Sequence, residues 1–487
     1  MRIGSSLVRI RNGAAPSGFV RNVIELLSGS TIGQLVAFLA SIVLTRVYGP
    51  GEFGILALYL GFISVLLSFV SLRYEVAIPL PAEDSEAASL VRVSTILILI
   101  VSSLVALAFY VIGHRLAALL KAEPLSPYLW LIPVTLLVSG LYQVLNYWSI
   151  RKKVFRGVAQ GRVFQALTQA VTQVGMGLAK IGAVGLLGGY LFGQLAGTWV
   201  TYRKARSEQS GHDNDREKAS LLQVANKYRQ FPLFTTWDGI LNNLSLQVPV
   251  FILAGTAGSV VVGLYSFGVR VIQAPFALLG QSVAQVFFSD ASEANREGLL
   301  AVRVLRVYNV LIRIGLSVFA PLMVTAPQVF SLLFGQTWAK SGCYVQILIP
   351  WMLLVFVNSP LSMVPIVMKR QDGDVIFQST LLVVRASAIY GGYLIGGADF
   401  AIWAFGAISA IWWLGFNGWI FRLVHIPAVK SVLVFAKPLL TTAAVCGIIL
   451  IVKAMVRYYS YAGLIDILST CVGGIFLFYL LVLKAER

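Results

Sequence analysis

The sequence predicts an all-α integral membrane protein with about fourteen transmembrane helices. Its 487 residues are 58% hydrophobic and only 12% charged, a composition that soluble domains do not show. The apolar residues fall into segments of about twenty, the length that a helix needs to cross a hydrocarbon core about 30 Å thick. We place the spans at 23–45, 53–72, 93–113, 128–149, 163–180, 183–202, 233–254, 260–288, 304–325, 343–367, 375–395, 399–421, 432–453 and 462–483.

Positive charge concentrates on one side of these spans. The net charge is +18, and with the N-terminus inside, the inner connections and tails hold about 28 of the 38 lysines and arginines. This bias predicts that both termini are cytoplasmic and that residues 1–22 form a cytoplasmic tail. A nucleic-acid-binding protein would instead cluster basic and aromatic residues on a soluble domain, so we expect no nucleic acid as a partner.

A polar stretch near the middle of the chain divides it into two halves. Residues 203–232 read as a cytoplasmic linker between a lobe of six helices over 23–202 and a second over 233–425, with two additional helices over 426–487. Gly49 and Gly54 recur at an offset of 209 residues as Gly258 and Gly263. With the linker at the midpoint, this echo favours parallel repeats related by an axis along the membrane normal.

Residues for catalysis or for holding a metal or cofactor are not evident. Cys343, Cys446 and Cys471 lack metal-ligand spacing, and the three histidines are far apart. The chain has no Walker-type glycine loop, HExxH motif or nucleophile elbow. The motifs therefore give no support to an enzyme, and we predict no metal or cofactor.

Arg270 is the most informative charge inside a predicted span. A charge there is costly unless it faces protein or water, so it needs a partner or a cavity. Gln273, Gln281 and Gln285 follow on the same helix face. We interpret this stripe as the wall of a water-filled cavity whose fixed cation receives an anionic head group. The alternative is that Arg270 pairs with a carbonyl group or with an acidic neighbour such as Asp238.

Other spans carry polar stripes, made mostly of amides. Their members are Gln165, Gln169 and Gln173 in the fifth span, Gln34 in the first, and Asp238, Asn242, Asn243 and Gln247 in the seventh. Amides at these spacings offer donors and acceptors to sugar hydroxyls, which suggests one central cavity. Hydrogen bonding between helices is the alternative for each stripe.

Three further arginines have simpler interpretations. Arg73, beside Glu75 at the inner end of the second span, forms either an interfacial ion pair or a cationic rim at the mouth of the cavity. Arg313 and Arg385 are expected to be set into contacts between helices.

The motifs resemble one known family. GSTIGQLVAFLASIVLTRVYGPGEFG and SLRYEVAIPLP are similar to the opening of polysaccharide-biosynthesis flippases of the Wzx type. YRQFPLF, GLYSFGVRVIQAPFALLGQSVAQVF and FGQTWAKSGCYVQILIPW followed by NSPLS resemble the same family, in order, through most of residues 25–380. The family belongs to the multidrug/oligosaccharidyl-lipid/polysaccharide exporter superfamily.

This resemblance implies two six-helix lobes around a central cavity in the bacterial inner membrane. It also implies a substrate, an oligosaccharide on undecaprenyl diphosphate moved from the cytoplasmic to the periplasmic leaflet, and work beside a glycan polymerase and a chain-length regulator. Arg270 resembles a cavity arginine of the related lipid II flippases. Those relatives also carry arginines midway along the first span, where this chain has Gln34 and Ala40.

Two other functions compete with the flippase. A multidrug cation exporter on the same fold needs acidic residues in its cavity, and Asp238 is the candidate for coupling ion flow to transport. A membrane-bound glycan polymerase or ligase normally needs a large external loop, whereas no predicted outer loop here exceeds about fifteen residues.

Overall fold

The computed structural model describes residues 18–119, 123–207, 220–368 and 370–427, together with isolated positions between 440 and 476. All regular elements in these residues are helical, and twelve of the predicted spans correspond to them, which confirms the predicted fold class. The last two predicted spans, within 426–487, lie outside the described residues apart from those isolated positions.

The first lobe contains six long helices, which pack both against sequence neighbours and against helices distant in sequence. The long helices are α2 (Gly18–Val47), α3 (Pro50–Leu67), α5 (Asp84–Leu119), α6 (Leu131–Arg151), α7 (Phe155–Leu178) and α8 (Ala183–Ser207). The short elements α4 (Tyr74–Ala77) and η1 (Glu123–Tyr128) lie in the connections. Helix α7 packs against α2 and α8, and α6 packs against α5 and α8.

The second lobe repeats this architecture. Its long helices are α10 (Thr236–Ala257), α11 (Ser259–Arg296), α12 (Leu300–Phe334), α13 (Ala339–Leu361) and α15 (Gln371–Leu423), with the short elements η2 (Phe231–Thr235), η3 (Gln336–Trp338) and α14 (Val364–Val367). Element α15 is two helices in sequence, because the backbone is non-helical at Gly396 and Gly397, where φ is 69°. This break falls between the predicted spans 375–395 and 399–421.

Length and hydropathy alone identify fewer spans than the structure contains. Nine stretches of the described residues are long and apolar enough to cross a membrane. Element α15 counts once among them although it holds two helices, and α7 is absent from them because its polar residues lower its mean hydropathy. A helix that fails this criterion can therefore be a membrane-spanning helix with one polar face.

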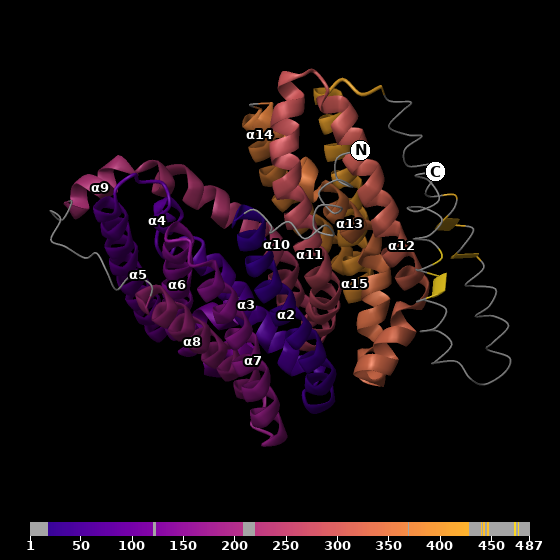
Figure 1. The fold of residues 1–487 in the computed structure, drawn as a ribbon. Helices are drawn as coiled ribbons and strands as arrows, with labels where there is room; N and C mark the ends of the chain where they lie inside the picture. The colour runs from indigo at the N-terminus through magenta and orange to yellow at the C-terminus, as the bar shows by residue number, and fades with distance from the viewer. Residues whose placement is uncertain are drawn as a thin grey trace.

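The lobes converge at one end of the molecule, which we name the hairpin end because the α2–α3, α10–α11 and α12–α13 connections lie there (Figure 1). Aromatic rings bridge the lobes: the ring centroid of Trp338 lies 4.9 Å from that of Phe53 and 4.5 Å from that of Phe267. The indole N–H of Trp338 also donates to the carbonyl oxygen of Thr45 at 3.1 Å. The hairpin end is thus closed by packed side chains.

Gly54 and Gly263, one of the two glycine pairs in the sequence echo, meet at this end. A Cβ on Gly54 would lie 1.8 Å from the carbonyl oxygen of Ser259, and a Cβ on Gly263 would lie 1.8 Å from that of Pro50. Pro50 and Ser259 are themselves 209 residues apart. The contact is therefore reciprocal, as expected for two repeats facing each other across a pseudo-two-fold axis. Only glycine permits backbones to approach this closely.

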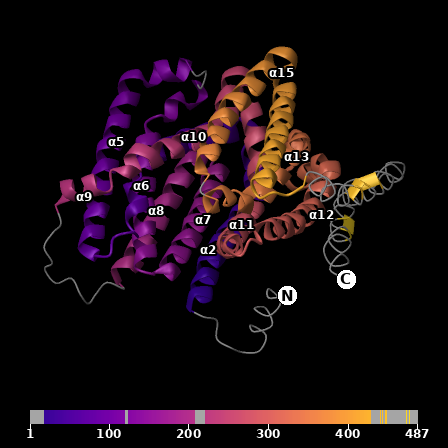
Figure 2. The same ribbon diagram turned by 90° about the horizontal axis from the view of Figure 1, so that it is seen from above.

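At the opposite end, which we name the linker end, the lobes diverge (Figure 1). Helix α9 (Leu221–Lys227) belongs to the predicted linker and lies on the first lobe, beside α5 (Figure 2). Its Lys227 ammonium lies 2.5 Å from the carboxylate of Glu86, and the hydroxyl of Tyr74 donates to the carbonyl oxygen of Ala225 at 3.0 Å. The linker is thereby attached to the first lobe before the chain enters the second.

Candidate functional site

Arg270 and Gln273 lie on the wall of a cavity of about 370 Å³ between the two lobes, which we call the interlobe cavity. Helix α3 of the first lobe contributes only apolar lining residues, and α10, α11 and α13 of the second lobe contribute the others. The polar lining residues all come from the second lobe and are Gln247, Tyr265, Ser266, Arg270, Gln273 and Trp351.

The side chain of Arg270 is exposed to this cavity although Arg270 lies within α11, three turns from the start of the helix. It interacts electrostatically with the phenol of Tyr190, which stands on α8 of the first lobe. Among the described lining residues none is acidic, so the cavity has a net positive wall. Such a wall attracts an anion, and the low dielectric of the surroundings strengthens that attraction.

Arg385 lies nearby but serves the packing. Its side chain is 3% exposed and donates to the hydroxyls of Ser245 and Ser409, each at 3.3 Å. Its guanidinium also lies 5.3 Å from the centroid of the Trp351 ring, which lines the cavity. Arg385 is therefore packed between helices, as the sequence suggested, and its contact with Trp351 supports one wall of the interlobe cavity.

A second cavity of about 410 Å³ lies inside the first lobe, between α2, α6 and α7, and we call it the first-lobe cavity. It brings together Gln34 of α2 with Gln165 and Gln169 of α7, three of the amides that the sequence marked. The structure therefore places the amides in a separate cavity, whereas the sequence suggested that they share one with Arg270.

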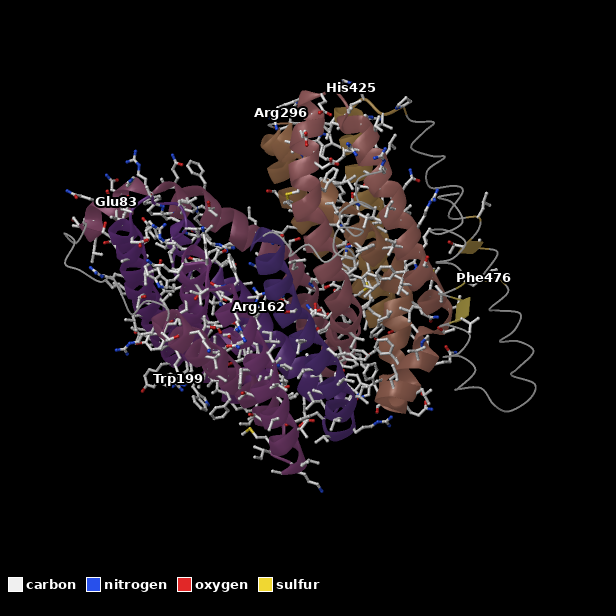
Figure 3. The ribbon with its side chains drawn as sticks, in the orientation of Figure 1. Glu83, Arg162, Trp199, Arg296, His425 and Phe476 are labelled. Atoms are coloured by element: carbon white, nitrogen blue, oxygen red, sulfur yellow. The ribbon has the colours of Figure 1, made fainter. Side chains whose placement is uncertain are left out.

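The first-lobe cavity also contains a cation that the sequence analysis missed. Arg162 of α7 lines it and donates to the hydroxyl of Ser30 on α2, and Figure 3 shows Arg162 within the first lobe, away from both ends of the bundle. The sequence pattern could have identified Arg162, because this residue precedes Gln165 and Gln169 by three and seven residues and so shares their helix face. The predicted span began at residue 163 and so excluded Arg162 by one residue, whereas α7 itself begins at Phe155.

Gln173, the third amide of that stripe, has its hydrogen bonds within the helix packing. It is 3% exposed, and its amide N–H donates to the carbonyl oxygen of Leu186 at 2.8 Å. The backbone carbonyl oxygen of Gln173 accepts from the hydroxyl of Tyr48 at 2.8 Å. Gln173 lies outside the linings of both cavities, and its contacts are those of a residue that joins α7 to α8 and α2.

Asn243 and Arg73 lie where α10 meets the connection after α3, nearer the linker end. The amide of Asn243 donates to the hydroxyl of Ser68 at 2.7 Å, a hydrogen bond between the lobes. The Arg73 guanidinium lies 4.0 Å from the carboxylate of Glu75 and packs against Gly239, where a Cβ would lie 2.3 Å from its Nη2. These contacts join the lobes.

The remaining candidate residues of the seventh and eighth spans are not placed in either cavity. Asn242 is exposed and lies outside both cavity linings. The side chains of Asp238 on α10 and Gln281 on α11 lie outside the described residues. Their assignment to coupling and to substrate binding stays a prediction.

The geometry defines the class of protein first. Two lobes of transmembrane helices meet at one end, diverge at the other, and enclose polar cavities, which is the arrangement of a multi-pass membrane transporter. A family model described as polysaccharide biosynthesis protein matches residues 43–342, well over half of the chain. The chain therefore belongs to the polysaccharide biosynthesis protein family. No curated protein matches the chain in sequence.

Two solved transporter structures share the fold of this chain. The lipid II flippase MurJ, in an inward closed conformation, matches with a TM-score of 0.73 and 11% identity over 94% of this chain and 99% of that one. An inward-facing multidrug resistance MATE transporter of the MOP superfamily matches with a TM-score of 0.53 and 16% identity over 83% and 95%. These likenesses confirm the predicted fold.

Proposed function

We propose that the protein is a flippase that carries an undecaprenyl-diphosphate-linked oligosaccharide repeat unit from the cytoplasmic to the periplasmic leaflet of a bacterial inner membrane. The unit is destined for a surface polysaccharide such as O-antigen, capsule or exopolysaccharide. The single observation that carries the proposal is the interlobe cavity, which presents Arg270 on a wall with no acidic residue among those described. A diphosphate and sugar hydroxyls cannot cross hydrocarbon unaided, because their polar groups would be left without partners.

In this mechanism the diphosphate binds at Arg270 while the lipid tail stays in the bilayer through the gap between the lobes. The hairpin end faces the periplasm, and both termini lie in the cytoplasm with the basic connections. The closed hairpin end and the diverging linker end correspond to access from the cytoplasm. Rocking of the lobes about the interlobe contact then exposes the cavity to the other side.

The direction of transport agrees with the sign of the cargo. An inside-negative membrane potential favours outward movement of negative charge by about 2.3 kcal/mol per charge per 100 mV. A potential-driven mechanism predicts that flipping slows when an ionophore collapses the potential. Flipping that is unchanged by the ionophore would remove this part of the proposal and leave ion coupling, for which Asp238 is the candidate.

A multidrug cation exporter is the main alternative on this fold. An exporter of that kind binds cations with carboxylates in its cavity, whereas each cavity described here has an arginine and no described acidic lining residue. A glycan polymerase or ligase normally needs a large external loop for its active site, and none is predicted in this chain. A glycan polymerase and a chain-length regulator remain the partners we expect beside the flippase.

The test uses proteoliposomes that contain a labelled undecaprenyl-diphosphate oligosaccharide from the native host. Transbilayer movement is compared for wild type, Arg270→Ala, the matched control Arg206→Ala and empty vesicles. Arg206 is exposed at the end of α8, outside both cavities. We expect movement with wild type and Arg206→Ala and little above the vesicle background with Arg270→Ala.

Each contrary result removes a defined part of the proposal. Movement that persists in Arg270→Ala would keep the flippase and overturn the site. No movement with wild-type protein and authentic substrate would overturn the flippase, and broad drug resistance in cells that express the protein would then favour the exporter.

A further inference from the structure

The first-lobe cavity is distinct from the cavity to which the proposed function assigns the diphosphate. It is lined by residues of α2, α6 and α7, which all belong to one lobe, whereas a group attached to a membrane lipid needs the gap between lobes. The two arginines also differ in depth. Counting 1.5 Å per residue, Arg162 lies about 24 Å along α7 from its hairpin end, and Arg270 lies about 16 Å along α11 from the same end.

Arg162 has hydroxyl partners but no carboxylate among the described residues. It donates to the Ser30 hydroxyl and interacts electrostatically with the phenol of Tyr142, and none of the ion pairs in the described part of the chain includes it. A guanidinium held within the membrane by neutral groups alone is costly. An anionic ligand would offset that cost through hydrogen bonds to a charged group, which are the stronger kind.

The rest of the lining is suited to hydroxyl groups. Gln165 and Gln169 present amides one helical turn apart, and Gln34 stands opposite them on α2. The Oε1 atom of Gln34 is buried and accepts no hydrogen bond from the protein. Buried acceptors of this kind normally have a partner, so a donor from a ligand or from water is expected here.

Helices α2 and α7 are in direct contact at one end of the cavity. Gly29 packs directly on Ala159, where a Cβ would lie 2.5 Å from the Ala159 Cα, one turn of α2 before Gly33 and Gln34. At Gly33 the space is larger, because the nearest atom is the Arg162 carbonyl oxygen at 3.4 Å. Two helices in contact at one level and apart at the next form a preformed pocket, whose volume lies within the usual range of small-ligand sites.

We propose that the first-lobe cavity is a glycan subsite that binds a negatively charged sugar residue. The acidic group of that sugar pairs with Arg162, and its hydroxyls hydrogen-bond to Gln34, Gln165 and Gln169. This inference rests on the proposed function and narrows its substrate class to acidic repeat units. Arg270 then binds the diphosphate, which all such lipids share, and Arg162 binds the acidic group of the sugar, which distinguishes one glycan from another.

The first experiment measures binding of free glycans, without lipid or diphosphate, to the purified full chain. The probes are a soluble oligosaccharide that contains a uronic acid and the same oligosaccharide after reduction of its carboxyl group. We expect wild type to bind the acidic form about tenfold tighter, the value of one charge-assisted hydrogen bond. Arg162→Gln should abolish that difference, Arg162→Lys should retain part of it, and the control Arg206→Gln should keep it whole.

A second variant protects this test against a fold defect in Arg162→Gln. Gln34→Glu keeps the size of its side chain and adds a negative charge opposite Arg162, so it should also lose the preference for the acidic probe. Equal affinity of wild type for both probes, or a preference that survives both Arg162→Gln and Gln34→Glu, would overturn the subsite.

The second experiment separates this subsite from the flippase function. Transport is measured for two lipid-linked glycans on the same undecaprenyl diphosphate, one acidic and one neutral. Arg162→Gln should reduce transport of the acidic glycan about tenfold relative to the neutral one. Equal loss of both would assign Arg162 to the shared diphosphate and overturn the subsite while the flippase stands. Selective binding of the acidic probe without transport of either lipid would support the subsite and overturn the flippase.

Discussion

Substitution of either contact glycine should open the hairpin end. A methyl group on Gly54 or Gly263 would lie 1.8 Å from a carbonyl oxygen of the other lobe, and Cβ atoms are essentially never closer than 3.0 Å to such an atom. The backbones must therefore separate by about 1.2 Å or more. Overpacking of this kind costs about 1–3 kcal/mol. Because the strain exists only while the lobes touch, the ratio of closed to open hairpin ends should fall about 5- to 150-fold.

A disulfide across the contact measures the closed population. A Cβ on Gly51 would lie 3.6 Å from the Val260 Cγ2, so cysteines at these two positions are close to the spacing that a disulfide requires. The pair is placed in a chain whose native cysteines are replaced by alanine, and the rate of oxidation is followed in membranes. We expect Gly54→Ala and Gly263→Ala to slow the oxidation.

The matched control is Gly188→Ala. Gly188 is also a buried helical glycine, but its nearest neighbour is the flexible side chain of Met176, with the Sδ atom 3.6 Å from the Cβ position. Oxidation should then proceed as in the parent chain. Equal rates in all three alanine variants would refute the reasoning, because they would mean that the strain is absorbed locally and does not bias the lobes.

Three further substitutions test other contacts. Trp338→Phe removes the hydrogen bond to the Thr45 carbonyl oxygen and should slow the same disulfide by about fivefold, for a loss of about 1 kcal/mol; an unchanged rate would contradict a role in closure. Arg385→Lys cannot satisfy both hydroxyl partners or stack as a guanidinium does, and it should lower the melting temperature in detergent, whereas the exposed Arg206→Lys should not. Burial raises the pKa of the Glu75 carboxyl, so its contribution favours the folded state below the unfolded pKa and is lost as pH rises through the folded pKa. Glu75→Gln should therefore flatten the pH dependence of the melting temperature above pH 4.5, and an unaltered profile would exclude this carboxyl as its source.

Helix positions could be predicted from sequence because each span must be about twenty apolar residues long, whatever its partners. The failures came from the same rule. Helix α7 fails a hydropathy criterion because Arg162 and its amides make one face polar, and the predicted boundary at 163 excluded the arginine by one residue. A helix-face count begun at Gln165 and carried backward would have found it.

The partition of polar residues between two cavities could not be predicted. Periodicity shows that residues share a helix face, but it does not show which neighbouring helix that face meets. Gln169 and Gln173 are one turn apart on α7, yet Gln169 lines the first-lobe cavity and Gln173 is sealed against α8. The difference depends on Leu186, whose carbonyl oxygen accepts the Gln173 amide, and such a contact is a property of the packed lobe.

The repeat is symmetric where the lobes must close and asymmetric where a ligand must bind. At the offset of 209 residues, Gly54 corresponds to Gly263, and both serve the same reciprocal contact. At the same offset Arg270 corresponds to Gly61, where a Cβ would lie 3.3 Å from the Gln247 side chain on the opposite lobe. A second arginine there would fill the space that admits α10 and would crowd the interlobe cavity with charge. Closure across a pseudo-two-fold axis requires equivalent surfaces, whereas binding one anionic group requires a cation on one wall only. Divergence of the two repeats at this position is therefore what the proposed site for a single diphosphate requires.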